Sequence, residues 1–195
     1  MKNLKVAPTE KKAALLDSAL SLFVKQGFHA TSTASIAKAA GVATGTLFHH
    51  FPSKDAILNE LFINIKQSFA DSIIQTSQLT GNIEQDANTL WQSAIDWAIA
   101  NPLKQTFFLQ FSFSVEINPS IRQQAMNEIL GFIVELIEQG LKQNVIADFP
   151  VPLLLENCHG QYLAAIRFFT DNPQLGQDST YRQASFQLFW RAMKK

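Results

Sequence analysis

The chain has 195 residues, of which 47% are hydrophobic and 16% are charged. Soluble domains average roughly 25% charged residues, so the low value predicts a large buried core or an apolar association surface. Sixteen Lys and Arg residues balance sixteen Asp and Glu residues, which excludes a protein that is strongly basic or strongly acidic throughout.

The balance hides a difference between the two ends of the chain. Residues 1–60 hold seven lysines against four acidic residues, which gives +3, and the remainder holds nine basic against twelve acidic residues, which gives −3. A basic front suits the approach to a polyanion, and an acidic rear does not.

Cysteine content and hydropathy bear on the compartment. Cys158 is the single cysteine, so an intrachain disulfide is excluded. The first twelve residues contain no apolar core of a signal peptide, and no run approaches 18 apolar residues. We therefore expect a cytoplasmic protein that makes no membrane contact.

Apolar periodicity predicts helices along the whole chain and no strand. The first runs over residues 9–27, where Leu16, Leu20 and Phe23 recur at helical spacing and Gly27 ends the helix. A short helix follows from Thr31 or Ser32 to about residue 40, and another covers residues 43–50. A long helix then begins after Ser53 and reaches about residue 75.

Asn-Pro and Phe-Pro pairs divide the rest of the chain. The remaining predicted helices cover residues 83–99, 102–114, 119–143, 152–170 and 178–193. The predicted fold class is all-α with about nine helices: a three-helix head on a larger helical body. We predict a helix-turn-helix DNA-binding domain over residues 1–53 and an effector-binding and dimerisation domain over residues 54–195, connected by the helix 54–75.

The stretch GVATGTLFHHFPSK, residues 41–54, has no carboxylate. At 100° per residue, a helix with Leu47 directed inward points Gly45 and His49 outward, with Thr46 and Phe48 on the flanks. A recognition helix needs such a small, donor-bearing face because it must approach base edges in the major groove.

Lys54 occupies the first position of the long helix, where the helix dipole disfavours a cation. A phosphate bound there would reverse that penalty. We expect the ammonium of Lys54 and free amides of residues 54–56 to hold one phosphate of the backbone of DNA.

The head resembles the DNA-binding domain of the TetR family of transcriptional regulators. The resemblance covers the first quarter to third of the chain and rests on many fixed spacings. The matching segments are Gly27-Phe28, Thr31 to Thr33, Ile36-Ala37, Ala40 to Val42, Gly45 to Leu47, Phe51 and Ser53-Lys54.

The resemblance implies a role for each residue of the head that matches. Thr44, Gly45 and Thr46 would face bases, and Thr33 would touch a phosphate or a base edge. Phe48, His49 and His50 occupy an aromatic or histidine segment of the family, and Lys54 is its phosphate-binding lysine. Family members usually have tyrosine where this chain has Phe48, so one phosphate hydrogen bond is missing.

The body contains the aromatic stretch TFFLQFSFSVE, residues 106–116. An ordinary aromatic core and a cavity for an apolar or aromatic molecule explain it equally well, and the resemblance favours the cavity because family members typically bind an effector in the body. The expected lining residues are Trp91, Phe107, Phe111, Cys158 and Tyr162. No charges cluster in the sequence of the body, which argues against a strongly ionic ligand.

The last two predicted helices are the expected dimer surface. Gly160 and Ala164 lie one turn apart and admit a close helix, and Phe186, Phe189 and Trp190 give the final helix an apolar face. Four such helices, two from each subunit, would pack around a two-fold axis. Packing within one subunit is the alternative.

We expect no metal and no cofactor, because His49-His50 and Cys158-His159 have no Cys or His at i+3 or i+4. No nucleophile–base pair, phosphate loop or paired carboxylates support an enzyme. The sequence therefore predicts a ligand-responsive homodimeric repressor with double-stranded DNA and a small-molecule effector as partners. The alternative is a small-molecule binding protein whose head binds DNA weakly or not at all.

Overall fold

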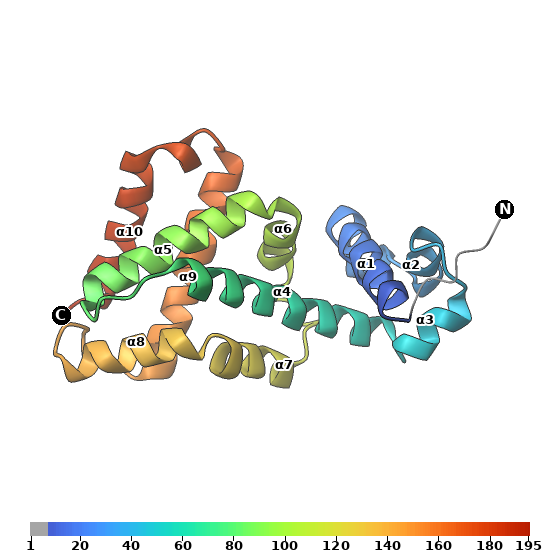
Figure 1. Cartoon of the computed structure of the whole chain (residues 1–195), viewed down its shortest axis with the longest axis horizontal. Coiled ribbons are helices and arrows are strands. Elements are labelled where there is room, and N and C mark those ends of the chain that lie inside the picture. Colours follow the sequence, from blue (N-terminus) through green and yellow to red (C-terminus); the bar gives the residue numbers. More distant parts are fainter. Residues whose placement is uncertain (1–7) are drawn as a thin grey trace. The chain divides into compact units, whose positions relative to one another are not determined.

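The computed structural model describes residues 8–195, and Figure 1 shows the course of the chain. Most of the segment on which the expectation of no signal peptide rests lies outside those residues. The described residues form ten α-helices and no strand apart from one isolated bridge between Ile146 and Lys194, so the predicted all-α fold is confirmed. Their bounds are α1 Pro8–Ala30, α2 Thr33–Ala39, α3 Thr44–His50, α4 Lys54–Thr76, α5 Ile83–Ala100, α6 Pro102–Phe111, α7 Pro119–Gln124, α8 Gly131–Lys142, α9 Val151–Asp171 and α10 Ser179–Met193.

The described helices fall into two compact units. Unit 1 contains residues up to Ile65 together with Leu103–Ile121, and unit 2 contains Lys66–Pro102 and Arg122–Lys195. Helix α4 therefore contributes its first half to unit 1 and its second half to unit 2. The domain boundary after residue 53 was predicted from function and not from compactness, and it stays a prediction.

Helices α1, α2 and α3 pack on one another at the N-terminal end of unit 1. Their apolar faces are buried because each helix carries large side chains at helical spacing: Leu15, Phe23, Ile36, Leu47 and Phe51 are at most 1% exposed. The backbone leaves helical geometry at Gly27, where φ is 80°, and a glycine adopts this value without steric cost. The head is thus a three-helix body that presents α3.

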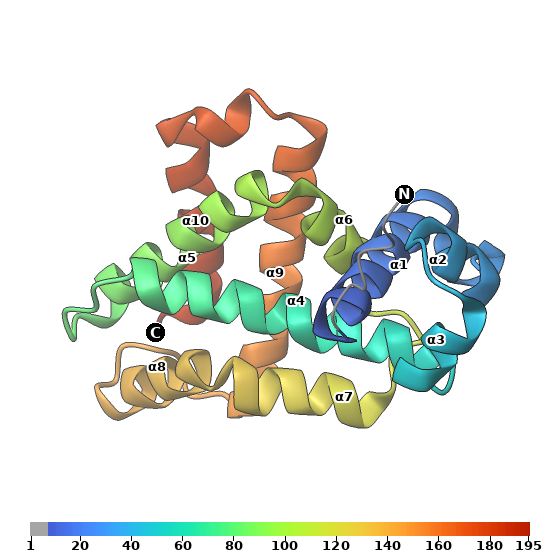
Figure 2. The ribbon, with the colours of Figure 1, turned by 45° about the vertical axis from the view of Figure 1, so that its right-hand side comes forward.

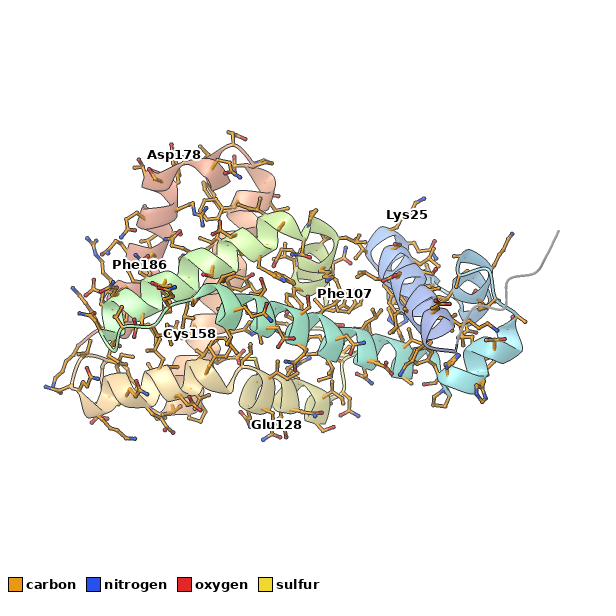
Figure 3. All side chains as sticks on the ribbon, viewed as in Figure 1. Lys25, Phe107, Glu128, Cys158, Asp178 and Phe186 are labelled. Atoms are coloured by element: carbon orange, nitrogen blue, oxygen red, sulfur yellow. The ribbon has the colours of Figure 1, made fainter. Side chains whose placement is uncertain are left out.

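Unit 2 is built from α5, α8, α9 and α10 with the second half of α4. Helix α10 packs on α5 and α9, and α8 packs on α5 and α9 (Figure 2). Figure 3 shows the side chains on the ribbon, among them Phe107 of α6 in unit 1 and Phe186 of α10 in unit 2. Trp190 and Phe186 are 1% exposed, so they belong to the core of unit 2.

The single helix predicted over residues 119–143 is wrong, because the structure divides it. Helix α7 ends at Gln124, and residues 125–129 form a π-helical turn in which the amide of Leu130 donates to the carbonyl of Ala125 at 3.1 Å. Leu130 leaves helical geometry before α8 begins at Gly131. A glycine at this place carries no side chain to favour continuation of the helix, and the sequence pattern alone does not show a π turn.

Candidate DNA-binding and ligand-binding sites

Helix α3 presents the face that the sequence predicts. Leu47 is fully buried, whereas Thr44, Gly45 and His49 are exposed and Phe48 is 50% exposed. A Cβ added to Gly45 would meet no atom within 4 Å, so the space in front of the backbone is open. The small residues Thr44 and Gly45 and the imidazole of His49 are therefore accessible to a molecule that binds α3.

Helix α2 has a complete capping box at its start. The amide of Ser35 donates to Oγ of Ser32 at 3.0 Å, and the amide of Ser32 donates to Oγ of Ser35 at 3.1 Å. Thr33, the first residue of α2, is half-buried. The Ser32–Ser35 pair caps α2, and Thr33 therefore stands in the first turn of a capped helix.

The ammonium of Lys54 is engaged inside the head. Its Nζ donates to the carbonyls of Phe28 at 2.7 Å and Thr31 at 2.9 Å, and it lies 4.1 Å from the centre of the Phe28 ring. The expectation of free amides at the start of α4 is wrong for Ala56, whose amide donates to Oγ of Ser53 at 3.1 Å. Lys54 thus joins the start of α4 to the α1–α2 connection, and its role toward phosphate stays a prediction.

Helix α6 belongs to the same unit as the head. The Phe111 and Phe23 rings lie 6.3 Å apart, Phe107 lies 4.7 Å from Phe111, and Nε2 of Gln110 donates to the carbonyl of Val24 at 3.2 Å. Nε2 of His29 lies 2.9 Å from a carboxylate oxygen of Glu116 in the segment that follows α6. Phe107 and Phe111 are therefore part of a packed core with α1.

The other predicted lining residues lie in unit 2. The rings of Phe69 and Tyr162 are 5.5 Å apart, those of Trp91 and Tyr162 are 6.4 Å apart, and Phe69 meets Trp97 edge to face at 5.1 Å. We call these four residues the aromatic cluster. Burial raises the pKa of the Tyr162 phenol, whose hydroxyl donates to the carbonyl of Ala94 at 3.4 Å.

Cys158 is directed toward the end of α10. Its Sγ lies 3.7 Å from Sδ of Met193, and burial raises the pKa of the thiol to about 12. A thiol with that pKa is almost wholly protonated at neutral pH, which makes it a poor nucleophile. The structure gives Cys158 the surroundings of a packing residue.

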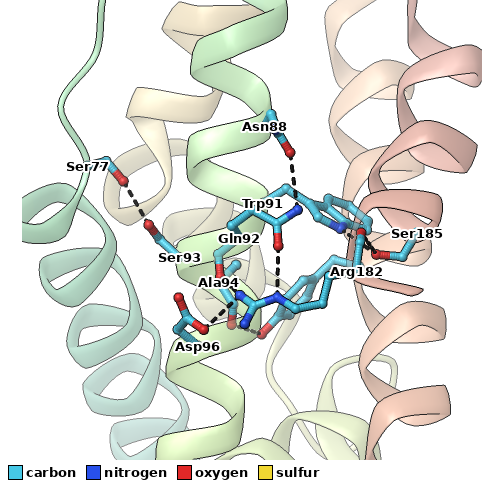
Figure 4. Close-up of polar contacts among 10 residues, drawn as sticks. Ser77, Asn88, Trp91, Gln92, Ser93, Ala94, Asp96, Arg182 and Ser185 are labelled. Atoms are coloured by element: carbon cyan, nitrogen blue, oxygen red, sulfur yellow. Dashed lines mark hydrogen bonds and ion pairs between the residues drawn. The ribbon is translucent and has the colours of Figure 1, made fainter. Parts of the chain in front are cut away.

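A polar network joins α5 to α10 in unit 2 (Figure 4). Nη2 of Arg182 lies 2.7 Å from a carboxylate oxygen of Asp96, and its Nε donates to the side chain of Gln92 at 2.9 Å. Nε1 of Trp91 donates to Oγ of Ser185 at 3.0 Å. The bond to Ser185 orients the indole ring of Trp91, and the contacts of Arg182 fix α10 to α5.

A basic group that sequence reasoning missed lies inside unit 2. Lys66 of α4 is 3% exposed, and its Nζ lies 3.4 Å from Nε2 of His159 on α9, which is 9% exposed. Burial, together with the charges of Lys66 and Arg122, lowers the pKa of His159 to about 3. We call Lys66, His159 and Arg122 the basic cluster; the expectation about the charge of the ligand stays a prediction.

The sequence did contain a signal for two members of the basic cluster. Lys66 falls in the apolar stripe of α4, between Phe62 and Phe69 at spacings of four and three, and His159 falls between Leu155 and Leu163. A charged side chain within such a stripe is buried, because the helix turns that face to the core.

The predicted dimer residues have two different environments. Gly160 is half-buried and Ala164 is exposed, and a Cβ on Gly160 would meet no atom within 4 Å. Phe186, Phe189 and Trp190 are 1–8% exposed inside the subunit, and Phe189 stacks on Trp91 at 4.6 Å. Their side chains fill the core of unit 2, as the alternative of packing within one subunit predicts.

Among residues 8–195, no three His, Cys, Asp or Glu side chains converge in a way that would hold a metal ion. No helix in the same range combines the length and hydropathy that a membrane span requires.

Both the head and the chain as a whole are similar to known proteins. Residues 15–61 match the family model described as bacterial regulatory proteins, tetR family. A crystal structure of a tetR family transcription regulator from Shewanella sp. PV-4 is 56% identical, with a TM-score of 0.93 over 95% of this chain and 98% of that one. The HTH-type transcriptional repressor KstR2 of Rhodococcus jostii is 25% identical over 89% of this chain and 86% of its own length.

One more structure shows the same fold at low identity. The transcriptional regulator FadR from Bacillus subtilis, in complex with stearoyl-CoA, is 18% identical and has a TM-score of 0.70 over 92% of this chain and 98% of its own. At that identity the likeness establishes the fold.

Proposed function

Because the chain belongs to the TetR family of transcriptional regulators, we propose that it is a homodimeric repressor that leaves a near-palindromic operator when a small apolar or aromatic molecule binds its body. The observation that carries the proposal is the exposed, carboxylate-free face of α3. The relationship to the repressor KstR2 supports repression as the direction of control.

The head has the means to bind duplex DNA without a strongly basic surface. Thr44, Gly45 and Thr46 would lie against base edges, where a small face permits close approach. Phe48 would contact a sugar or a thymine methyl group. His49 and His50 are the last two residues of α3 and would lie near the sugar-phosphate backbone of the DNA. Since α3 carries no Arg, Asn or Gln, DNA shape would supply part of the specificity.

Few direct base contacts per head make dimerisation necessary for useful affinity. Two heads related by a two-fold axis would bind half-sites separated by one or more helical turns. Helices α9 and α10 are the proposed contact, because Gly160 leaves open space and four large side chains of these helices are at least 43% exposed. These side chains are Leu153, Phe168, Tyr181 and Leu188.

The effector would act through α4 and α6. Residues 54–65 of α4 belong to unit 1 and residues 66–76 to unit 2. A ligand that displaces α4 within the body would therefore also displace the segment of α4 that follows α3. Helix α6 is tied to α1 by the Phe111–Phe23 contact and the Gln110–Val24 bond. A ligand changes operator affinity only by its differential affinity for the two states.

A second function is favoured by one observation. Phe48 lies 50% exposed at a place where the family usually offers a tyrosine hydroxyl to phosphate. A small-molecule binding protein with a weak head would tolerate that loss. DNA affinity measured at several salt concentrations separates the two functions, because phosphate contacts give affinity a steep salt dependence.

The test of DNA binding uses Thr44→Glu, which places a carboxylate on the exposed face of α3. Fragments of genomic DNA retained by the purified protein are first sequenced to define an operator. Repulsion from phosphates is then expected to weaken operator binding about 100-fold, as measured by fluorescence anisotropy.

The matched control is Gln75→Glu, which adds the same charge at an exposed position of α4 in unit 2. Operator affinity is expected to change less than twofold in this variant. A wild-type protein that retains no fragment, or equal affinities of wild type and Thr44→Glu, contradicts the repressor function.

A further inference from the structure

Lys54 closes the segment that contains α2 and α3. The carbonyl of Thr31, which accepts from Nζ of Lys54 at 2.9 Å, stands two residues before α2 begins, and Lys54 stands four residues after α3 ends. The same Nζ donates to the carbonyl of Phe28 at 2.7 Å. We call these two hydrogen bonds the Lys54 clamp. Both ends of the helix-turn-helix segment therefore meet at one ammonium.

The carbonyls of the Lys54 clamp belong to a backbone that is itself held in place. The amide of Thr31 donates to the carbonyl of Phe28 at 3.2 Å, and Oγ1 of Thr31 donates to the carbonyl of Gly27 at 2.8 Å. Thr31 is 1% exposed and Phe28 is 9% exposed. Because its partners are buried, the ammonium of Lys54 is directed toward the interior of the head.

The contacts of the ammonium leave little of it for another partner. An ammonium has three N–H groups, and the Lys54 clamp uses two of them. The ring of Phe28 covers a further side, with its centre 4.1 Å from Nζ. Carbonyl oxygens and an aromatic face both attract a cation, so they supply the compensation that the sequence assigned to a phosphate at the start of α4.

Helix α3 depends on accurate placement because its exposed side chains are short. Thr44, Gly45 and Thr46 form its first turn, and no long side chain of that turn could follow a displaced base edge. Hydrogen bonds weaken steeply when their distance and angle change. A small movement of α3 relative to α2, which carries Thr33, would therefore cost contacts on both helices.

We propose that Lys54 is a positioning residue for operator recognition: the Lys54 clamp fixes the two ends of the α2–α3 segment, and Lys54 itself contacts no phosphate. This rests on the proposed function, to which it adds how the head keeps its DNA-binding face in place. The ammonium acts through the carbonyls of Phe28 and Thr31, which set where α2 begins, and through the start of α4, which sets where α3 ends.

The test compares Lys54→Met with wild type on two duplexes of equal length, the operator and a random sequence. The methionine keeps an apolar stem and removes both hydrogen bonds. Affinities of the full-length protein are measured by fluorescence anisotropy at several salt concentrations, under conditions in which circular dichroism shows each variant to be folded.

The Lys54 clamp and a direct phosphate contact predict different results. If Lys54 positions the helices, operator affinity falls about tenfold, affinity for the random duplex changes less than about twofold, and the slope of log affinity against log salt stays the same. If Lys54 contacts a phosphate, both affinities fall alike and the slope decreases by about 1.

Hydrogen exchange tests the Lys54 clamp without DNA. Amides of α2 and α3 are expected to exchange about tenfold faster in Lys54→Met, because the segment is no longer tied at its ends. Amides of α8, in unit 2, are expected to keep the rates of the wild type. Lys54→Gln keeps one shorter donor and serves if Lys54→Met does not fold, with a smaller loss of operator affinity and the same salt slope.

Two control variants separate positioning from charge and from stability. Lys25→Met removes the same charge from an exposed lysine of α1, and Leu15→Val trims a fully buried side chain of α1 away from the Lys54 clamp. Both are expected to bind operator within about twofold of wild type when folded, since neither touches the ends of the α2–α3 segment.

The inference is overturned if the salt slope of Lys54→Met falls by about 1, if both duplexes lose affinity alike, or if operator affinity is unchanged. A wild-type protein that retains no DNA fragment refutes the repressor function instead. Hydrogen exchange then decides the Lys54 clamp by itself: faster exchange of α2 and α3 in Lys54→Met supports it, and unchanged rates contradict it.

Discussion

Two lysines on α4 have opposite surroundings. In unit 1, the ammonium of Lys54 is held by the carbonyls of Phe28 and Thr31 at 2.7 and 2.9 Å and by the face of the Phe28 ring. In unit 2, the ammonium of Lys66 is buried and lies 3.4 Å from a nitrogen of His159. One ammonium is held by carbonyl oxygens and an aromatic ring, and the other lies in the interior beside an imidazole.

The difference lies in how each site treats a positive charge. Carbonyl oxygens and an aromatic face lower the energy of a cation, so Lys54 contributes to the stability of the head. Lys66 is 3% exposed, and this burial lowers the pKa of its ammonium to about 7.

The pH dependence of stability tests whether Lys66 is buried. Lys66 has a pKa of about 7 in the folded chain against 10.5 in the unfolded chain, so above pH 7 the unfolded state binds more protons. Stability therefore rises with pH, and between pH 7 and pH 9 the gain from this group is about 2 kcal/mol. Below pH 7 both states hold the proton, and Lys66 contributes no slope.

The measurement is urea unfolding of wild type and Lys66→Met at pH 5, 7 and 9. His159 adds a slope of the same sign between about pH 3 and pH 6.5 because its pKa is lowered, and it does so in both proteins. The two stability curves are expected to diverge only above pH 7. Parallel curves from pH 7 to 9 would show that Lys66 is solvated.

The second test removes the favourable member of the pair. Lys54→Met deletes two charge-assisted hydrogen bonds of a half-buried ammonium, which is expected to cost about 2 kcal/mol. Lys66→Met is expected to leave stability at pH 7 unchanged or higher, since an apolar group replaces a buried amine. The unfolding midpoint at pH 7 should therefore fall in Lys54→Met and not in Lys66→Met, and equal losses would remove the distinction between the two lysines.

The two regions also differ in what the sequence discloses. The site on the head lies within residues 27–58, where fixed local spacings identify α3, its buried Leu47 and the exposed Thr44 and Gly45 before any coordinates exist. Even there, the partners of Lys54 were missed. They are backbone carbonyls 26 and 23 residues earlier in the chain, and residue identity says nothing about where a carbonyl points.

The basic cluster shows more clearly which features the sequence does not predict. Lys66 and His159 are visible as polar residues in apolar stripes, but their contact spans 93 residues and depends on how α4 packs beside α9. Arg122 carries no such signal. It follows a proline helix start in a segment that reads as one helix, and the π turn that the structure places after Gln124 has no periodic signature.

The smallest expected effect sharpens the view of α3 as a surface made for close approach. Gly45→Ala adds a methyl group that meets no atom of the protein within 4 Å, so the head gains about 0.5 kcal/mol of stability from helix propensity. The same methyl group stands between the α3 backbone and the base edges, and operator affinity is expected to fall about tenfold. Gly131→Ala, which also meets open space at the start of α8, is the control whose operator affinity stays unchanged. A glycine that lowers stability yet raises DNA affinity is selected for the approach of the backbone, and an affinity unchanged in Gly45→Ala would place the DNA contact elsewhere on the head.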